Sequence, residues 1–206
     1  MVLKDINIRQ KDLIPESISS EMAMVVGVGG IGNWVAINLA LIGVKTIILI
    51  DPDTIEESNL NRTLFKVSDI GRPKVDALKD LILERRPDTI ISTHQDYLTI
   101  GHLNTYKNVA LFDCTDTLRT REFVQNFRDN LKDYIKLGYD GFEGTIAHDD
   151  FGSGAWGEEI NDSSYTIVPS FFGTPELLSV LGISEVYLKS NMKNKTKNID
   201  VTKILE

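Results

Sequence analysis

The chain has 206 residues, 42% of them apolar and 25% charged, which is the composition of a globular protein with a core of ordinary size. Its formal net charge of −8 argues against proteins that hold DNA or RNA through an excess of lysine and arginine, so we expect no nucleic-acid partner. Apolar runs long enough to span a membrane and a signal-peptide pattern are both missing, so we expect a cytoplasmic protein with no membrane partner.

The most informative stretch is a strand, a glycine turn, a helix and a second strand. Residues 24–26 predict an apolar strand, 31–41 a helix that Gly43 ends, and 47–50 a second strand that leads into Asp51. The glycines of the turn are Gly27, Gly29, Gly30 and Gly32. They allow close approach to a ligand, and the N–H groups at the helix start attract phosphate. Asp51 follows at the spacing of a ribose ligand, so we favour a nucleotide-binding unit over a structural turn.

Strand-like and helix-like periods alternate through the first two thirds of the chain. This order predicts an α/β fold, namely a Rossmann-like open, mostly parallel sheet with helices on both faces. Pro73 opens a helix that ends near Pro87. The next expected elements are a strand at 89–93, a short helix at 101–106, a strand at 109–112, a helix at 119–131 and a strand at 134–137.

The pattern changes after Gly138. Glycines and acidic residues there predict hairpins and loops, which form an antiparallel C-terminal extension beside the sheet and include Trp156, a residue able to contact a partner. A last helix is expected at 175–188, and the polar tail at 190–198 is expected to be frayed. The three histidines lack the spacing of metal ligands and are expected at the surface or in loops: His94, His102 and His148.

Polar clusters follow several of the expected strands. Asn59 and Arg62 lie in the loop after Asp51, Lys74 begins a helix, and Asp116 follows the strand at 109–112. The carboxyl ends of parallel strands are where open sheets bind ligands. Two cations for phosphates, together with a carboxylate able to hold Mg²⁺, suit ATP better than NAD.

These residues resemble the ThiF/MoeB/HesA adenylyltransferases and the adenylation half of ubiquitin-activating enzymes. The resemblance covers about residues 20–147, and residues 1–206 are read as a single domain of this type, with C-terminal loops and a helix at 148–206. Its motifs are Gly27-x-Gly29-Gly30-x-Gly32, Asp51-Pro52-Asp53-Thr54, Ser58-Asn59-Leu60-Asn61-Arg62, Asp69-Ile70-Gly71-Arg72-Pro73-Lys74, and Asp113-Cys114-Thr115-Asp116 followed by Arg121.

The resemblance implies ATP-dependent adenylylation of a carboxylate, usually the C-terminal glycine of a ubiquitin-like or sulfur-carrier protein or of a peptide, with release of pyrophosphate. It implies that Asp51 binds ribose, that Asn59, Arg62 and Lys74 face the triphosphate, and that Asp116 positions Mg²⁺. It also implies a homodimer, in which Arg9 of the Ile8-Arg9-Gln10 segment reaches the ATP site of the partner subunit. A solvated N-terminal charge is the alternative for Arg9.

Departures from the family pattern leave two other functions open. Thr117 stands where the family usually has Asn, and no cysteine follows Gly138. The single cysteine, Cys114, is read as a packing residue; since zinc-binding cysteine pairs are absent, we expect no zinc. A non-catalytic nucleotide-binding scaffold of the same fold is therefore one alternative. An NAD-dependent oxidoreductase is another, disfavoured because no acid or base suited to hydride transfer follows the glycine turn.

Overall fold

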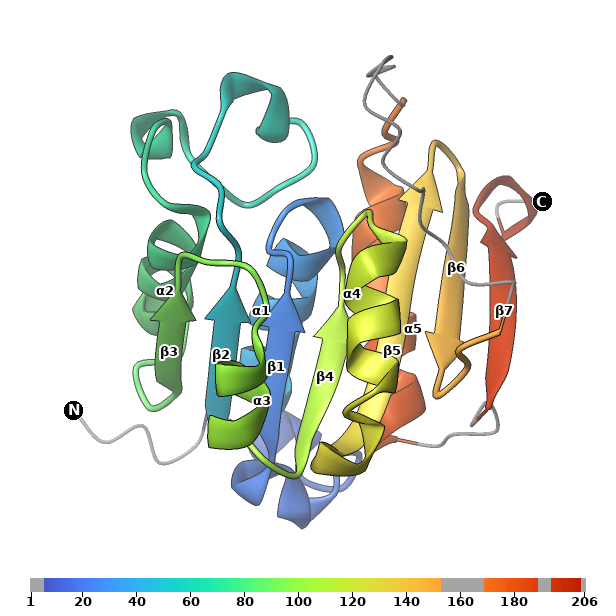
Figure 1. The fold of residues 1–206 in the computed structure, drawn as a ribbon. Helices are drawn as coiled ribbons and strands as arrows, with labels where there is room; N and C mark the ends of the chain where they lie inside the picture. The colour runs from blue at the N-terminus through green and yellow to red at the C-terminus, as the bar shows by residue number, and fades with distance from the viewer. Residues whose placement is uncertain (1–5, 153–168, 189–193, 205–206) are drawn as a thin grey trace.

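A computed structural model describes residues 6–152, 169–188 and 194–204 and shows one seven-stranded sheet in the order β3-β2-β1-β4-β5-β6-β7 (Figure 1). Strands β1 to β5 pair in parallel, and β6 and β7 run antiparallel to their neighbours. The strands are β1 (Met22–Val26), β2 (Thr46–Ile50), β3 (Ile90–His94), β4 (Val109–Asp113), β5 (Leu131–Asp140), β6 (Glu143–His148) and β7 (Lys195–Asp200). The expected Rossmann-like sheet with an antiparallel extension is confirmed.

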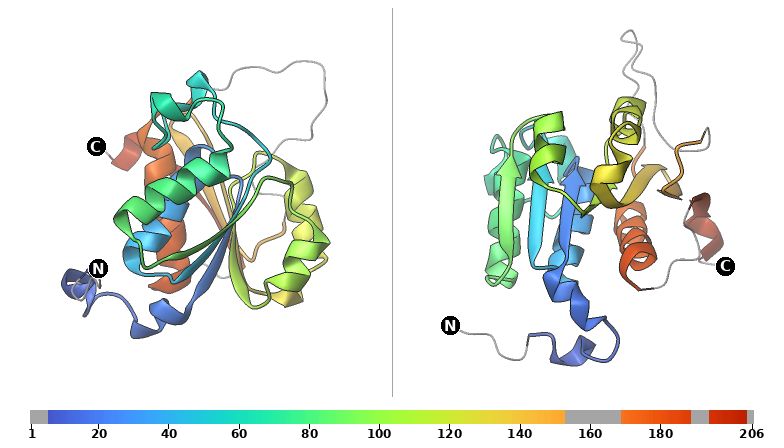
Figure 2. Two further views of the ribbon diagram at one scale, coloured as in Figure 1. Left: turned by 90° about the vertical axis from the view of Figure 1, so that its left-hand side faces the viewer. Right: turned by 60° about the horizontal axis from the view of Figure 1, so that its bottom comes forward.

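Helices cover both faces of the sheet, as Figures 1 and 2 show. Helices α1 (Gly30–Ile42), α2 (Lys74–Arg85) and α5 (Gly173–Tyr187) pack on one face, and α3 (Ile100–Thr105) and α4 (Leu118–Gln125) pack on the other. Strand β1 is apolar throughout because its side chains are buried on both faces of the sheet. Val25 lies in the core under α1, and Met24 lies in the core under α3 and α4. Both faces of the central strands are therefore buried.

The order of the strands places a ligand site at one edge of the sheet. The chain runs from β1 to β2 and β3 on one side, and then crosses to β4 on the other side of β1. Connections leave the carboxyl ends of β1 and β4 in opposite directions, which opens a crevice between them. The long segment between β2 and α2 lies over this same end of the sheet (Figure 1).

The helix expected at 119–131 is too long. Helix α4 ends at Gln125, a short 3₁₀ turn spans Arg128–Asn130, and β5 already begins at Leu131. Leu131 is buried and pairs with Val109 of β4. This residue, which the sequence pattern assigned to the end of the helix, therefore belongs to the sheet. Strand β5 also continues past the expected end at residue 137, because β6 pairs with it as far as Asp140.

The tail is not frayed over its whole expected length. Residues 195–200 form β7, which pairs with β6 from His148↔Lys195 to Glu143↔Asp200. The polar sequence of β7 does not predict a strand. The strand forms by pairing with β6, which lies about 50 residues earlier in the chain. Trp156 lies outside the described residues, as does the part of the tail at 190–193.

His148 is buried, so its expected surface position is wrong. It ends β6 opposite Ile135 of β5, and only 2% of the residue is exposed. His94 and His102 are half-buried at the end of β3 and in α3. Within the described ranges, none of the helices has the length and apolar character that crossing a membrane requires.

Candidate active site

A cleft of about 640 Å³ lies at the carboxyl ends of β1, β2, β4 and β5. It brings together most of the residues that the sequence singled out, although they come from five separate segments. Its walls include Gly27, Gly29, Gly30, Asp51, Asn59, Arg62, Lys74 and Asp116. Gly32 and Arg9 are not among the lining residues. The strand order therefore assembles a single pocket from the glycine turn and four other polar segments.

The glycine turn joins β1 to α1 and leaves space for a ligand. Gly27 has φ +79°, and its N–H donates to the Ile50 carbonyl, which holds the turn against β2. A Cβ on Gly32 would lie 1.8 Å from the carbonyl oxygen of Gly27, so this glycine lets the helix approach the turn. A Cβ on Gly29 would meet nothing within 4 Å, because Gly29 borders the cleft. The first N–H groups of a helix have no partner within the helix, so those of α1 can bind an anion.

Asp51 is buried at the end of β2 and holds the turn in place. Its Oδ2 accepts from the Val28 N–H at 2.7 Å, and its Oδ1 accepts from the Asp53 N–H at 2.9 Å. Burial raises the pKa of Asp51, while the charge of Lys74 and the two N–H donors oppose that change. Since each carboxylate oxygen has more than one lone pair, Asp51 can also accept from ribose hydroxyls at the cleft wall.

Lys74 begins α2 and lines the cleft. Its Nζ lies 2.8 Å from Asp53 Oδ2, and its backbone N–H donates to the Asp53 carbonyl at 3.0 Å. The Lys74 side chain is 11% exposed and that of Asp53 is 60% exposed. A phosphate entering the cleft therefore finds a lysine whose present partner is free to turn into solvent.

Helix α1 supports the loop that carries Asn59 and Arg62. Trp34 Nε1 donates to the Arg62 carbonyl at 3.1 Å, and the Leu64 N–H donates to Asn33 Oδ1 at 2.9 Å. The Trp34 ring also packs against the core. Within the loop, Arg62 Nη1 donates to the Ser58 carbonyl at 2.6 Å and to Asn61 Oδ1 at 2.9 Å, so contacts within the loop hold the guanidinium at the cleft.

A buried ion pair lies beneath the motif that contains Asp116, and the sequence interpretation missed it. Lys136 Nζ lies 3.1 Å from Asp113 Oδ1, and both side chains have no exposed area. Asp113 Oδ1 also accepts from the Thr115 hydroxyl at 2.7 Å, and its Oδ2 accepts from the Tyr134 hydroxyl at 2.8 Å. Lys136 Nζ donates in addition to the Thr115 carbonyl. A lysine within an apolar strand is the sequence signal that could have revealed this pair.

The two aspartates of this motif have different surroundings. Both oxygens of Asp113 are engaged by protein donors, whereas Asp116 is exposed at the cleft. Mg²⁺ prefers carboxylates that leave room for water and phosphate oxygens. Asp116 has that character and Asp113 does not, so Asp116 is the residue of this motif that would hold a magnesium ion.

Tyr139 and Cys114 are two further lining residues. A Cβ on Gly30 would lie 2.8 Å from the Tyr139 hydroxyl, which is hydrogen-bonded to the Ser170 hydroxyl at 2.9 Å. Burial and the charge of Asp113 raise the pKa of the Cys114 thiol, so the thiolate is disfavoured at neutral pH. Cys114 packs against the core, in line with the packing role expected from the sequence.

Arg9 lies at the other end of the molecule from the cleft. It is exposed in a 3₁₀ turn, Ile8–Gln10, and the neighbouring Gln10 donates through Nε2 to the Leu41 carbonyl at 2.9 Å. Leu41 is near the carboxyl end of α1, which lies by the amino ends of the strands (Figure 1). Arg9 therefore does not contribute to the cleft of its own chain.

Comparison with known proteins gives a family and several relatives. Residues 7–148 match the ThiF family. Ubiquitin-like modifier-activating enzyme 5 of Caenorhabditis elegans is 31% identical over 132 residues, which are 64% of this chain and 29% of the relative. Sulfur carrier protein ThiS adenylyltransferase of Escherichia coli strain K12 is 33% identical over 112 residues, which are 53% of this chain and 45% of the relative. The matched part is thus less than half the length of these curated relatives.

Solved structures share the fold at low sequence identity. E. coli MccB with MccA-N7isoASN has a TM-score of 0.76 at 19% identity, over 98% of this chain and 72% of that one. E. coli MccB with ATP has a TM-score of 0.68 at 21% identity, over 90% of this chain and 65% of that one. PaaA has a TM-score of 0.73 at 21% identity, over 90% and 62%. These likenesses establish the fold.

Proposed function

The chain belongs to the ThiF family, and on that premise we propose that it is an ATP-dependent adenylyltransferase that activates a carboxylate with release of pyrophosphate. The observation that carries the proposal is the convergence of Arg62, Lys74 and Asp116 on one cleft that the glycine turn also lines. Relatives named as adenylyltransferases support the same activity. We propose that one adenylation domain comprises the whole chain.

Each lining residue has a role that follows from its position. Asp51, buried beside the turn, accepts from the ribose hydroxyls. The N–H groups at the start of α1 and the side chains of Asn59, Arg62 and Lys74 bind the triphosphate. We assign Mg²⁺ to Asp116; when bound, the ion neutralises charge on the phosphate oxygens.

The reaction requires charge stabilisation more than proton transfer. A carboxylate oxygen attacks the α-phosphorus, a new O–P bond forms, and the bond from that phosphorus to the leaving pyrophosphate breaks. The nucleophile is already ionised at neutral pH, so no general base is needed. Arg62 and Lys74 oppose the repulsion between two anions and stabilise the charge that develops on pyrophosphate.

Exchange of labelled pyrophosphate into ATP tests the activity. We expect exchange that depends on both Mg²⁺ and a carboxylate, with a small carrier protein and synthetic peptides ending in glycine as the probes. Asp116→Ala should abolish exchange, and Arg62→Ala or Lys74→Ala should weaken it strongly. Normal exchange in Asp116→Ala would refute the proposed metal role.

Lys66→Ala is the matched control for Lys74→Ala. Lys66 is an exposed lysine that pairs with Glu84 at 3.5 Å and is not among the residues lining the cleft, so its removal should leave exchange unchanged. Calorimetric titration separates the alternatives that the sequence left open. Binding of ATP with no exchange against any carboxylate would indicate a non-catalytic scaffold, and binding of NAD in place of ATP would indicate an oxidoreductase.

The substrate class follows from the relatives' names. They include an enzyme that adenylylates the sulfur carrier protein ThiS, and MccB structures solved with MccA. We propose that this chain activates the C-terminal carboxylate of a ubiquitin-like or sulfur-carrier protein or of a peptide. We propose that such a tail enters the cleft beside Gly138 and Tyr139, which form part of its wall.

We propose a homodimer in which Arg9 completes the partner's site. The distance of Arg9 from its own cleft supports this arrangement, since its charge is useful to a nucleotide only across a subunit boundary. Size-exclusion chromatography with light scattering tests the dimer. Mixing Arg9→Ala with Asp116→Ala subunits tests the shared site, because only mixed dimers regain an intact site. We also propose that the protein acts in the cytoplasm, where ATP is abundant.

A further inference from the structure

Tyr139, near the end of β5, lines the cleft with a hydroxyl that has no role in the reaction described above. Gly30, the first residue of α1, lines the same cleft. A Cβ on Gly30 would lie 2.8 Å from the Tyr139 hydroxyl oxygen, and 3.4 and 3.5 Å from two carbons of its ring. The phenol end of Tyr139 therefore lies against the first turn of α1.

The alternation of side chains along β5 directs Tyr139 toward α1. Ile135 and Leu137 belong to the core on the α1 face of the sheet, and Tyr139 packs against the same core. The strand carries the ring as far as the glycine turn because β5 continues past residue 137, where the sequence pattern predicted its end. The residue directly opposite Tyr139 on β6 is Gly144, so no side chain at that position competes for the space beside the ring.

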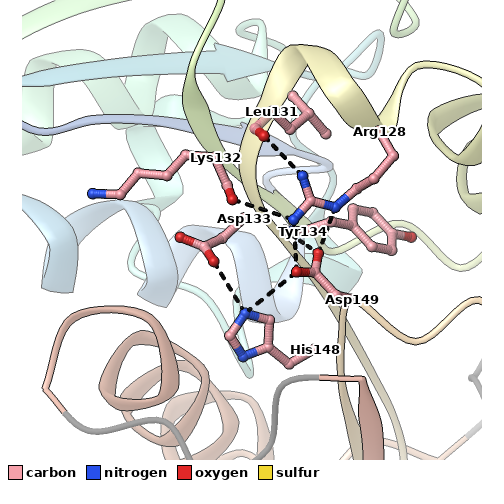
Figure 3. Close-up of polar contacts among 7 residues, drawn as sticks. All are labelled: Arg128, Leu131, Lys132, Asp133, Tyr134, His148 and Asp149. Carbon is pink, nitrogen blue, oxygen red and sulfur yellow. Dashed lines mark hydrogen bonds and ion pairs between the residues drawn. The ribbon is translucent and has the colours of Figure 1, made fainter.

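The pairing of β5 with β6 is stabilised at the end farther from Tyr139. Arg128 donates to Asp149 through Nε at 2.7 Å and through Nη2 at 2.6 Å, and the Tyr134 N–H donates to the same carboxylate at 3.1 Å (Figure 3). These bonds join the two strands, since Tyr134 lies on β5 and Asp149 directly follows β6. The strand that carries Tyr139 is thus held between β4 on one side and β6 on the other.

Ser170 orients the Tyr139 hydroxyl. The two hydroxyl oxygens lie 2.9 Å apart. Ser170 is itself held against the turn between β5 and β6, because it forms a parallel bridge with Gly141, whose N–H donates to the Pro169 carbonyl at 2.9 Å. A phenol oxygen can accept one hydrogen bond while its own O–H donates another. When Ser170 donates to Tyr139, the phenol can therefore donate its proton to an acceptor in the cleft.

A phosphate is the acceptor that this position favours. The cap residue of α1 is Gly29, which has no side chain to accept from the first N–H groups of the helix. These N–H groups and the positive end of the helix dipole attract anions. Since the Tyr139 hydroxyl lies against Gly30, a phosphate bound at the start of α1 lies within its reach.

We propose that Tyr139 is a further catalytic residue, whose hydroxyl donates a hydrogen bond to a phosphate of the bound nucleotide while it accepts one from Ser170. This inference rests on the proposed function, because it requires a nucleotide whose phosphates bind at the start of α1. The phenol keeps its proton throughout. Ser170 is a positioning residue that acts through Tyr139. A hydrogen bond to a charged acceptor is stronger than one between neutral groups, so the loss of this single oxygen should be measurable.

Calorimetric titration of the full chain with ATP and Mg²⁺, in a buffer without carboxylates, tests the role of Tyr139. Tyr139→Phe removes only the hydroxyl oxygen and should lower the affinity for ATP roughly tenfold or more, the effect of losing one hydrogen bond to a charged group. Tyr106→Phe is the matched control. The Tyr106 hydroxyl also lies 2.9 Å from a serine hydroxyl, that of Ser92, but Tyr106 is not among the residues lining the cleft. It should bind ATP like the wild type.

Ser170→Ala tests the positioning role. It should lower the affinity for ATP when Tyr139 is intact, and it should have no further effect when combined with Tyr139→Phe. Ser170→Thr keeps the hydroxyl and should bind ATP like the wild type. Additive effects of Ser170→Ala and Tyr139→Phe would contradict a role of Ser170 through Tyr139. Ser170→Ala also remains informative if circular dichroism shows that Tyr139→Phe does not fold.

The contact with a phosphate is overturned if Tyr139→Phe binds ATP with the affinity of the wild type. An unchanged affinity together with a higher KM for the carboxylate in pyrophosphate exchange would assign the hydroxyl to the tail of the substrate instead. A wild type that binds ATP but catalyses no exchange refutes the proposed activity alone, because the titration still measures this contact. A wild type that binds no ATP refutes both.

Discussion

Removing the buried cation under the Asp116 motif should destabilise the protein by an amount that the contacts allow us to estimate. Lys136→Met deletes the only positive charge that contacts Asp113 among the described residues, at a position with no exposed area. Breaking a buried ion pair by removing one partner costs about 3 to 5 kcal/mol. Asp113 keeps the hydrogen bonds from Thr115 and the Tyr134 hydroxyl, so we expect the lower end of this range, about 3 kcal/mol.

Urea unfolding followed by circular dichroism measures this change. A loss of about 3 kcal/mol lowers the folding equilibrium constant by more than about a hundredfold. With an m-value of about 2 to 3 kcal/mol/M, the midpoint falls by about 1 to 1.5 M urea and the slope is unchanged. The double variant Asp113→Asn with Lys136→Met is the control. It removes both charges and should be more stable than Lys136→Met alone.

The same substitution should affect the cleft. Lys136 donates to the Thr115 carbonyl, and Thr115 directly precedes Asp116. Losing this contact loosens the segment that presents Asp116, so Lys136→Met should require more Mg²⁺ for half-maximal exchange. If Lys136→Met unfolds within about 0.5 kcal/mol of the wild type, the range expected of a neutral surface change, the reasoning about the buried pair is wrong.

Three further outcomes follow from the turn and its supports. Gly32→Ala places a Cβ 1.8 Å from the Gly27 carbonyl oxygen, so ATP affinity measured by calorimetry should fall roughly tenfold or more, and unchanged affinity would contradict the close approach of α1. Trp34→Phe keeps an aromatic ring but loses the bond to the Arg62 carbonyl, which should cost about 1 kcal/mol of stability and raise the KM for ATP. Burial raises the pKa of Asp51 above its ordinary value of 3.8. The Asp51 carboxyl group therefore contributes its full stabilisation below pH 3.8, and this contribution is lost as the pH rises through the raised pKa of the folded protein. The stability of the wild type relative to Asp51→Asn, measured by urea unfolding across the acidic range, should therefore fall with rising pH, and a rise would refute this sign.

The sequence by itself determined the half of the molecule that contains the glycine turn. The strand before Gly27, the helix that ends at Gly43 and the carboxylate of Asp51 depend on local backbone preferences and on apolar periodicity, which neighbouring residues specify. The sequence also predicted that the polar motifs lie at the ends of strands. Because parallel strands end at one edge of the sheet, residues at several strand ends could be expected to meet before any contact was known.

Only the tertiary structure decided which buried polar groups face one another. Lys136 of β5 contacts Asp113 of the neighbouring strand β4. Arg86 donates to the Ala40 and Leu41 carbonyls near the end of α1. The strand at residues 195–200 and the burial of His148 also depend on pairing between distant segments. The energies of these contacts come from desolvation and pairing between groups far apart in the chain, for which local sequence carries no periodic signal.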